Sequence, residues 1–262
     1  MLNSAKRIVI KIGSSLIIGE DGFVRTEWLA TLAHDIAELK KSGKEIIIVT
    51  SGAVGVGRLM LNYGMQKLLL EEKQAAAACG QAHLIGYWQK AFDDTQKSEL
   101  YAAQILLTAD DINSDTRAMN ARNTLETLLK NPHIVPVINE NDTVATEELR
   151  VGDNDSLAAH VAKMAGADLL ILFSDIDGLY SENPRTNPNA VFQAEIREIT
   201  RTIEAMAGGA GSSVGTGGMA TKIAAAKIAT AAGCNMIIAR GTENHPLQAL
   251  ANGGKHSVFL AS

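Results

Sequence analysis

Five polar segments of the sequence combine lysines, glycines, carboxylates and amides in patterns that suit the handling of anions. They are residues 11–15 (KIGSS), 50–57 (TSGAVGVG), 139–156, 174–180 (SDIDGLY) and 215–222 (GTGGMATK). In the first and the last, a lysine stands beside glycines, whose backbone N–H groups can approach phosphate oxygens closely. The sequence therefore predicts an anion site with Lys11 and Lys222 as its cations. The alternatives are an exposed lysine at a strand end and a flexible surface loop.

The segment 50–57 contains three glycines and directly follows a predicted strand. Its backbone N–H groups can face an anion, and the helix that follows adds its positive end. A glycine-rich turn that only allows close helix–strand packing is the alternative. Because the segment is neither GxGxxG nor a Walker A sequence, it predicts neither a dinucleotide site nor a P-loop.

Amides and carboxylates are crowded between residues 139 and 156, after another predicted strand and at the start of the next helix. Asp153 or Asn154 can serve only to cap that helix, and Asp155 only to complement its dipole. Capping explains one or two of these residues but not the whole set. Carboxylates here can bind an ammonium group or orient a lysine, and amides can bind a carboxylate.

The segment that begins with Ser174 and Asp175 follows a fourth predicted strand. An Asp-Gly pair such as the one it contains is a common turn signal. Because the segment follows a strand, the competing interpretation is that it faces a bound nucleotide.

Short β-branched runs that alternate with amphipathic stretches must position these segments. We predict strands at 7–12, 45–50, 134–138, 169–173 and 235–239, and helices at 26–41, 71–92, 117–129, 155–165 and 219–232. Gly43 and Gly166 follow two of the helices, where a left-handed stop is favoured. The alternation predicts an α/β fold, a three-layer αβα sandwich around a mainly parallel central sheet, with ligands at the carboxyl ends of its strands. We expect one domain with two lobes, 1–170 for the acid substrate and 171–262 for the nucleotide.

The bulk composition fits such a fold, since 46% of the residues are apolar and only 4% are aromatic. The 24 basic and 29 acidic residues argue against a general nucleic-acid or anionic-membrane surface. Cys79 and Cys234 form no CxxC pair, so neither a disulfide framework nor a cysteine zinc site is expected. The apolar runs are of strand length or have helical periodicity, so no targeting or membrane segment is predicted, and we expect a cytoplasmic location.

Six motifs in order, KIGSS, VTSGAVGVG, INENDTV, DNDSL, SDIDGLY and GTGGMATK, make the chain resemble the amino-acid kinase family over nearly its whole length. Within the family, the resemblance is to members that act on L-glutamate. It implies transfer of the γ-phosphoryl group of ATP to the side-chain carboxylate, with Mg²⁺, as the first step of proline biosynthesis. Many such members carry a C-terminal PUA module, which we expect this chain to lack.

The resemblance also implies roles for individual residues. Lys11 and Lys222 would contact the phosphates, and Asp155 would hold both lysines in place. The substrate would be bound by Ser51, Gly52, Asn139, Asp142, Asp153 and Asn154. ATP would be contacted by Lys11, Gly13, Ser174, Asp175, Thr216, Gly217, Gly218, Met219, Ala220, Thr221 and Lys222. Since no His/Asp/Glu ligand cage is evident, no metal ligand is predicted in the chain, and Mg²⁺ is expected to be held mainly by phosphate oxygens and water.

The same resemblance implies a homo-oligomer, a dimer or a tetramer, and a possible hand-off of the product to glutamyl-phosphate reductase. A related kinase for acetylglutamate, aspartate, carbamate or uridylate is one competing reading. The polar segment 139–155 disfavours it, because a free α-ammonium group gives those carboxylates a partner that an acetylated substrate lacks. A nucleotide-binding regulator without turnover is the other, and it leaves both lysines unexplained.

Overall fold

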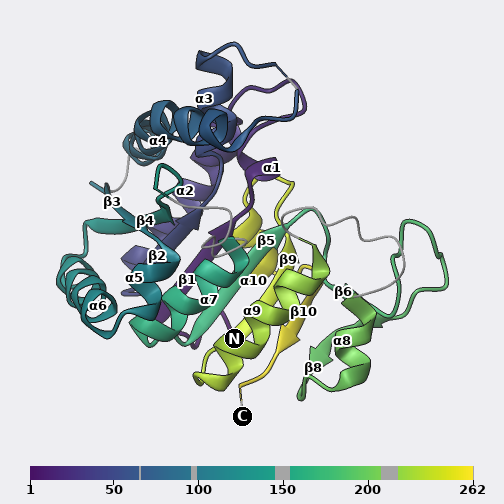
Figure 1. Cartoon of the computed structure of the whole chain (residues 1–262). Helices are drawn as coiled ribbons and strands as arrows, with labels where there is room; N and C mark the ends of the chain where they lie inside the picture. Colours follow the sequence, from purple (N-terminus) through teal and green to yellow (C-terminus); the bar gives the residue numbers. More distant parts are fainter. Residues whose placement is uncertain (65, 96–98, 145–153, 208–217, 262) are drawn as a thin grey trace.

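An eight-stranded sheet forms the centre of the protein in the computed structural model, which describes residues 1–64, 66–95, 99–144, 154–207 and 218–261 (Figure 1). Its strand order is β3-β4-β2-β1-β5-β9-β10-β8. The strands are β1 (Arg7–Ile12), β2 (Glu45–Thr50), β3 (Tyr101–Leu107), β4 (Ile134–Glu140), β5 (Leu169–Ser174), β8 (Glu195–Ile196), β9 (Asn235–Arg240) and β10 (His256–Phe259). Every neighbouring pair is parallel except β9–β10, which is antiparallel.

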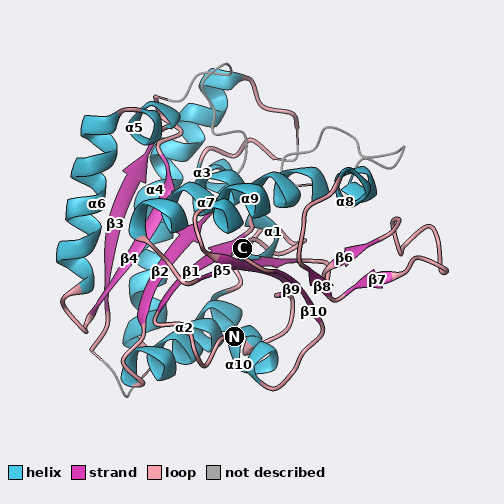
Figure 2. Ribbon diagram, turned by 90° about the horizontal axis from the view of Figure 1, so that it is seen from below, coloured by secondary structure: helices cyan, strands magenta, loops and turns pink. Residues whose placement is uncertain are grey.

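Helices cover both faces of this sheet (Figure 2). Helices α2 (Thr26–Lys41), α4 (Leu70–Asp93) and α10 (Pro246–Ala251) contribute to the core on one face, and α6 (Asp115–Leu129), α7 (Asn154–Ala165) and α9 (Met219–Ala231) to the core on the other. The predicted three-layer fold is confirmed. The central strands are apolar on both faces because both are covered.

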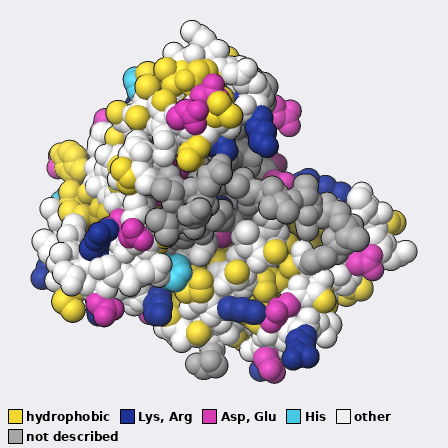
Figure 3. Space-filling model, in the orientation of Figure 1, with side chains coloured by type: hydrophobic (Ala, Val, Ile, Leu, Met, Phe, Trp, Pro, Cys, Tyr) yellow, Lys and Arg dark blue, Asp and Glu magenta, His cyan; other side chains and the backbone are white. Residues whose placement is uncertain are grey.

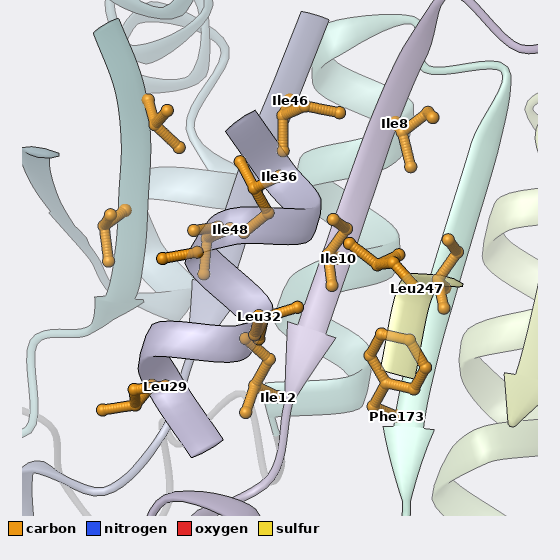
Figure 4. Close-up of a cluster of buried hydrophobic side chains, with 14 of the residues drawn as sticks. Ile8, Ile10, Ile12, Leu29, Leu32, Ile36, Ile46, Ile48, Phe173 and Leu247 are labelled. Atoms are coloured by element: carbon orange, nitrogen blue, oxygen red, sulfur yellow. The ribbon is translucent and has the colours of Figure 1, made fainter. Parts of the chain in front are cut away.

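The alternation of side chains along β1 shows how the two cores are built. Ile8, Ile10 and Ile12 enter the core that contains α2, while Val9 enters the opposite one. Lys11 follows the same alternation as Val9 and therefore points to the face of α7 and α9. On α2, buried residues that include Leu29, Leu32 and Ile36 lie on the face toward the sheet (Figure 4).

The smaller elements lie mostly at the ends of the strands. They are α1 (Ser14–Ile17), α3 (Ala53–Met60), α5 (Ala109–Asn113), α8 (Arg201–Ala207), β6 (Leu179–Tyr180) and β7 (Phe192–Gln193). Helix α3 crosses α4 at two glycines, Gly57 and Gly80. A Cβ atom on Gly57 would overlap the carbonyl oxygen of Ala76, and one on Gly80 would overlap that of Ala53. The glycines of the segment 50–57 thus include one that the helix crossing requires.

The ten predicted elements are present, and β1, β2 and α2 have the predicted bounds. Gly43 (φ 81°) and Gly166 (φ 59°) adopt the predicted left-handed conformation. Several elements were not predicted, among them β3, whose sequence YAAQILL neither alternates nor forms a continuous β-branched run, and the four-residue β10. No helix within the described ranges has both the length and the apolar character needed to span a membrane.

Candidate active site

A cavity of about 1140 Å³ lies at the carboxyl ends of β1, β2, β4 and β5. Ten of the predicted site residues line it: Lys11, Gly13, Ser51, Gly52, Asn139, Asp142, Asn154, Ser174, Asp175 and Lys222. They come from segments that are far apart in the sequence. The parallel sheet brings these segments together because its strand ends meet at one edge.

Two lysines share one buried carboxylate at this edge. Lys11 Nζ lies 2.6 Å from Asp155 Oδ1, and Lys222 Nζ lies 2.9 Å from Asp155 Oδ2. The hydroxyl of Thr221 donates to Oδ2 at 3.0 Å. Lys11 is the next-to-last residue of β1, Asp155 lies in the first turn of α7, and Lys222 lies in the first turn of α9. The packing of α7 on both α9 and β1 therefore brings the three together.

The charges of this triad leave an excess of positive charge at the cavity. Asp155 is fully buried, and Lys11 and Lys222 are 5% and 3% exposed. Burial raises the pKa of Asp155, but the attraction and hydrogen bonds of Lys11 and Lys222 outweigh it and hold the pKa at about 2. The carboxylate is therefore ionised at neutral pH, and both lysines line the cavity.

A hydrogen-bonded amide cluster forms a second part of the cavity wall. Asn154 Nδ2 donates to the carbonyl of Thr50 at 2.7 Å, to Ser51 Oγ at 2.6 Å and to Asn139 Oδ1 at 3.1 Å. Asn139 in turn donates to Gln81 Oε1 at 2.8 Å. Asn154 thus links the ends of β2 and β4, which is more than a helix cap would do.

Gly52 and Asp142 also line the cavity. Gly52 has φ 106° immediately before α3, a conformation that L side chains rarely adopt. This position requires glycine because the chain turns sharply there from β2 into α3. Asp142 follows β4 and adds a carboxylate to the wall.

The residues predicted to contact ATP are only partly gathered at the cavity. Ser174 Oγ donates to Asp175 Oδ1 at 3.1 Å, and Arg185 lies 2.6 Å from Asp175 Oδ2. Burial raises the pKa of Asp175, but the hydrogen bonds from Arg185 and Ser174 together have the larger effect, so the pKa lies below its ordinary value.

The glycine-rich loop before α9 accounts for the remaining predicted ATP contacts. Gly218 is the N-cap of α9, and Met219, Ala220 and Thr221 form its first turn without lining the cavity. Asp153, Thr216 and Gly217 lie outside the described residues.

The cavity also contains charged residues that the sequence analysis did not single out. Arg58 comes from the last turn of α3, Lys73 from the start of α4, and Glu140 from the end of β4. Arg58 directly follows the glycine segment, and Glu140 lies inside the polar segment 139–156, so both positions carried a signal. Lys73 carried none, because nothing in the sequence indicates that α4 approaches the cavity.

Comparison with protein families gives a match to the amino acid kinase family over residues 6–240. The chain belongs to the amino acid kinase family. This kinase is 56% identical over 260 residues to the glutamate 5-kinase of Paramagnetospirillum magneticum and 52% identical over 261 residues to that of Agrobacterium fabrum. These matches cover 99% and 100% of the kinase chain, and 69% and 66% of the two relatives. The chain thus spans about two thirds of the length of its curated relatives.

Two solved structures share the fold of this kinase at low sequence identity. The UMP kinase from Ureaplasma parvum has a TM-score of 0.63 at 17% identity and covers 97% of this chain and 98% of its own. The carbamate kinase from Giardia lamblia bound to AMP-PNP has a TM-score of 0.67 at 14% identity and covers 99% of each chain. Both similarities concern the fold.

Proposed function

We propose that this kinase transfers the γ-phosphoryl group of ATP to the side-chain carboxylate of L-glutamate, giving L-glutamyl 5-phosphate as the first step of proline biosynthesis. The observation that carries the proposal is the pair of ammonium groups, Lys11 and Lys222, held by one buried carboxylate at a polar cavity. The glutamate 5-kinases to which the chain is more than half identical support the choice of substrate.

The chemistry requires positioning and positive potential rather than a general base. The nucleophile is already a carboxylate anion, and it must approach a polyanion while charge spreads over the transferring phosphoryl group. Lys11 neutralises the transferring phosphoryl oxygens, and Lys222 supports the β-phosphate that leaves. Asp155 acts as a positioning residue, because it is buried behind both lysines and fixes their ammonium groups.

The site would hold Mg²⁺ together with the triphosphate. Mg²⁺ prefers oxygen ligands and keeps much of its water, and the carboxylate of Asp175 and the hydroxyl of Ser174 on the cavity wall fit an ion held by phosphate oxygens and water. When bound, the ion neutralises phosphate charge. The loop residues Thr216, Gly217, Gly218, Met219, Ala220 and Thr221 keep the ATP contacts that the family resemblance implies.

The amide cluster and Asp142 bind the amino acid. The α-ammonium group of glutamate pairs with Asp142, while Ser51 and Asn154 hold a carboxylate. Asp153 keeps the substrate contact that the family resemblance implies. Arg58 and Lys73 add cations on the same cavity for a substrate that has two carboxylates. An acetylated substrate would leave Asp142 without its ammonium partner, which favours free glutamate.

A hydroxamate-trapping assay with a substrate panel tests the activity. Glutamate should give trapped acyl phosphate, and acetylglutamate, aspartate and carbamate little or none, with ADP release dependent on glutamate. ATP binding without glutamate-dependent ADP release would support a regulator without turnover and overturn the proposal.

Lys222→Met tests the assigned mechanism in the same assay. Losing one fixed donor should lower kcat about 10²- to 10³-fold. Lys227→Met is the matched control on the same helix, because Lys227 pairs with Glu204 at 2.7 Å with both side chains about half exposed. Turnover near that of the unmodified chain in Lys222→Met would eliminate the role of Lys222.

We further propose that the chain forms a single domain with two lobes, which meet where β1 pairs with β5. The protein is proposed to be a cytoplasmic homo-oligomer, a dimer or a tetramer, and to hand its product to glutamyl-phosphate reductase. Basic and acidic side chains are interspersed on the face drawn in Figure 3, and the net charge is −5, which supports small-molecule rather than nucleic-acid partners. Light scattering after gel filtration measures the oligomer, and co-elution with the reductase tests the hand-off.

A further inference from the structure

A group of potential metal ligands lies where α2 meets the segment that leads into α10. One ring nitrogen each of His34 and His245 and one carboxylate oxygen of Asp35 lie within 4.8 Å of one another. None of the three residues lines the kinase cavity. We propose that they form a structural binding site for a zinc-type divalent metal ion, which the sequence analysis did not predict.

Asp35 and His245 are already held in place by several contacts. Asp35 Oδ2 accepts from the backbone N–H groups of Leu247 at 3.1 Å and Gln248 at 3.2 Å, and Oδ1 lies 2.8 Å from His245 Nδ1. The backbone N–H of His245 donates to Thr31 Oγ1 at 3.0 Å. Asp35 is 6% exposed and the side chain of His245 is 41% exposed, so both ligands are fixed before any ion arrives, at a position that an ion can reach from solvent on the His245 side.

His34 supplies the observation that points to a ligand. Its Nδ1 atom is buried and has no hydrogen-bond partner among the described residues, although buried polar atoms are nearly always paired. The ring of His34 stands edge-on to that of His245, with centroids 5.6 Å apart and an interplanar angle of 89°. Helix packing and the cap on α10 explain Asp35, but they leave this nitrogen unexplained.

The ligand types select the class of metal. Two imidazoles and one carboxylate suit Zn²⁺ and its neighbours in the first transition row, whereas Mg²⁺ prefers oxygen alone. Bonds of about 2.0–2.1 Å around a tetrahedral ion place ligand atoms about 3.4 Å apart. The ligand atoms of the three residues now lie up to 4.8 Å apart, so the most distant pair has to move closer by roughly 1.4 Å when the ion binds. Water takes the fourth position.

Such an ion would join residues 210 positions apart in the sequence. Its three ligands connect α2, in the first half of the chain, with the segment before α10 near the end. A metal bound only by the folded chain stabilises it against unfolding. The inference is independent of the phosphotransfer proposed above, because it uses different residues and a different readout.

Cobalt titration of the full chain, prepared without a histidine tag and stripped of metal, tests the proposal. We expect one Co²⁺ per chain, with the visible absorption of a four-coordinate ion, and displacement of Co²⁺ by Zn²⁺. Absence of that absorption in the unmodified chain would overturn the proposal without any variant.

Two variants and a control locate the ion. His245→Asn removes the ring but retains a residue that tolerates the left-handed conformation (φ 57°) found there, and His34→Gln removes the second ring. His83→Gln, at an exposed position on α4, is the control. Absorption should be lost in the first two variants and kept in the control. Retention in both site variants would place the metal elsewhere and refute the assignment.

Thermal unfolding gives a second readout. At a Zn²⁺ concentration about a hundred times Kd, Tm should rise by about 5–10 °C for a chain of this size. The rise should disappear in His34→Gln and His245→Asn if both variants unfold cooperatively without metal. An equal rise in these variants would contradict the proposal.

Discussion

Replacing Asp155 with asparagine removes the negative charge that lies between two buried ammonium groups. The substitution keeps the size of the side chain, so the change is mainly electrostatic. Lys11 and Lys222 would lose the partner that contacts them at 2.6 and 2.9 Å. We expect the variant to lose both stability and turnover.

The size of the stability loss follows from the structure. The pKa of Asp155 is about 2 instead of the ordinary 3.8, and at about 1.36 kcal/mol per pH unit the ionised form is favoured by about 2 kcal/mol. Removing one partner of a buried pair costs more, roughly 3–5 kcal/mol, because the remaining charges stay buried. For a chain of 262 residues this corresponds to a fall in Tm of about 6–20 °C.

The effect on turnover separates positioning from folding. Because both lysines lose their fixed positions, kcat should fall about 10²- to 10³-fold. The KM for glutamate should change less, since the amide of Asn154 is held in place by Thr50, Ser51 and Asn139. Coupled ADP release at saturating ATP, below the Tm of the variant, measures both constants.

Asp168→Asn provides the matched control. Asp168 Oδ2 accepts from the backbone N–H groups of Lys6 and Arg7, both at 2.8 Å, at the opposite end of β1. This variant should lose some stability and keep its kcat. If Asp155→Asn retained kcat within about tenfold and Tm within about 2 °C of the unmodified chain, the electrostatic argument would be wrong.

Three further predictions follow from the same contacts. The folded pKa of Asp155 lies below its ordinary value, so the contribution of this carboxylate to stability should be complete above about pH 5 and lost as the pH falls through about 2. In urea unfolding, the difference in the free energy of unfolding between the unmodified chain and Asp155→Asn should therefore become smaller in acid; a difference that does not change with pH would contradict this. Gly57→Ala in α3 should lower Tm because its Cβ would overlap the Ala76 carbonyl of α4. Gly86→Ala, elsewhere on α4, has open space around its Cβ and should gain about 0.5–1 kcal/mol of stability; equal thermal melts would refute the close approach. Asp142→Asn should raise the KM for glutamate about 10- to 100-fold and lower kcat less, and an unchanged KM would remove Asp142 from the ammonium site.

The main elements were predictable because their signals are local. Continuous β-branched runs predicted the central strands, and amphipathic periods predicted the long helices, including α2 with its stop at Gly43. Strand β3 was missed because its sequence lacks both patterns. The antiparallel β10 was missed because four residues are too few to show a period.

The polar segments of the site were also predictable, although their partners were not. The types of Asn154 and Asp155 allowed either a helix cap or a binding role. The structure shows Asn154 donating to the ends of β2 and β4, and Asp155 paired with two lysines. Lys73 was missed because its place at the cavity depends on how α4 packs.

The sequence by itself determined the elements, the parallel class of the sheet and the residue types gathered at its carboxyl edge, because these depend on neighbours within a few positions. Only the tertiary structure decided that Lys11 and Lys222 meet on one carboxylate and that His34, Asp35 and His245 converge. Those contacts join residues tens to hundreds of positions apart, and the order of the strands and the packing of the helices on them set which side chains meet.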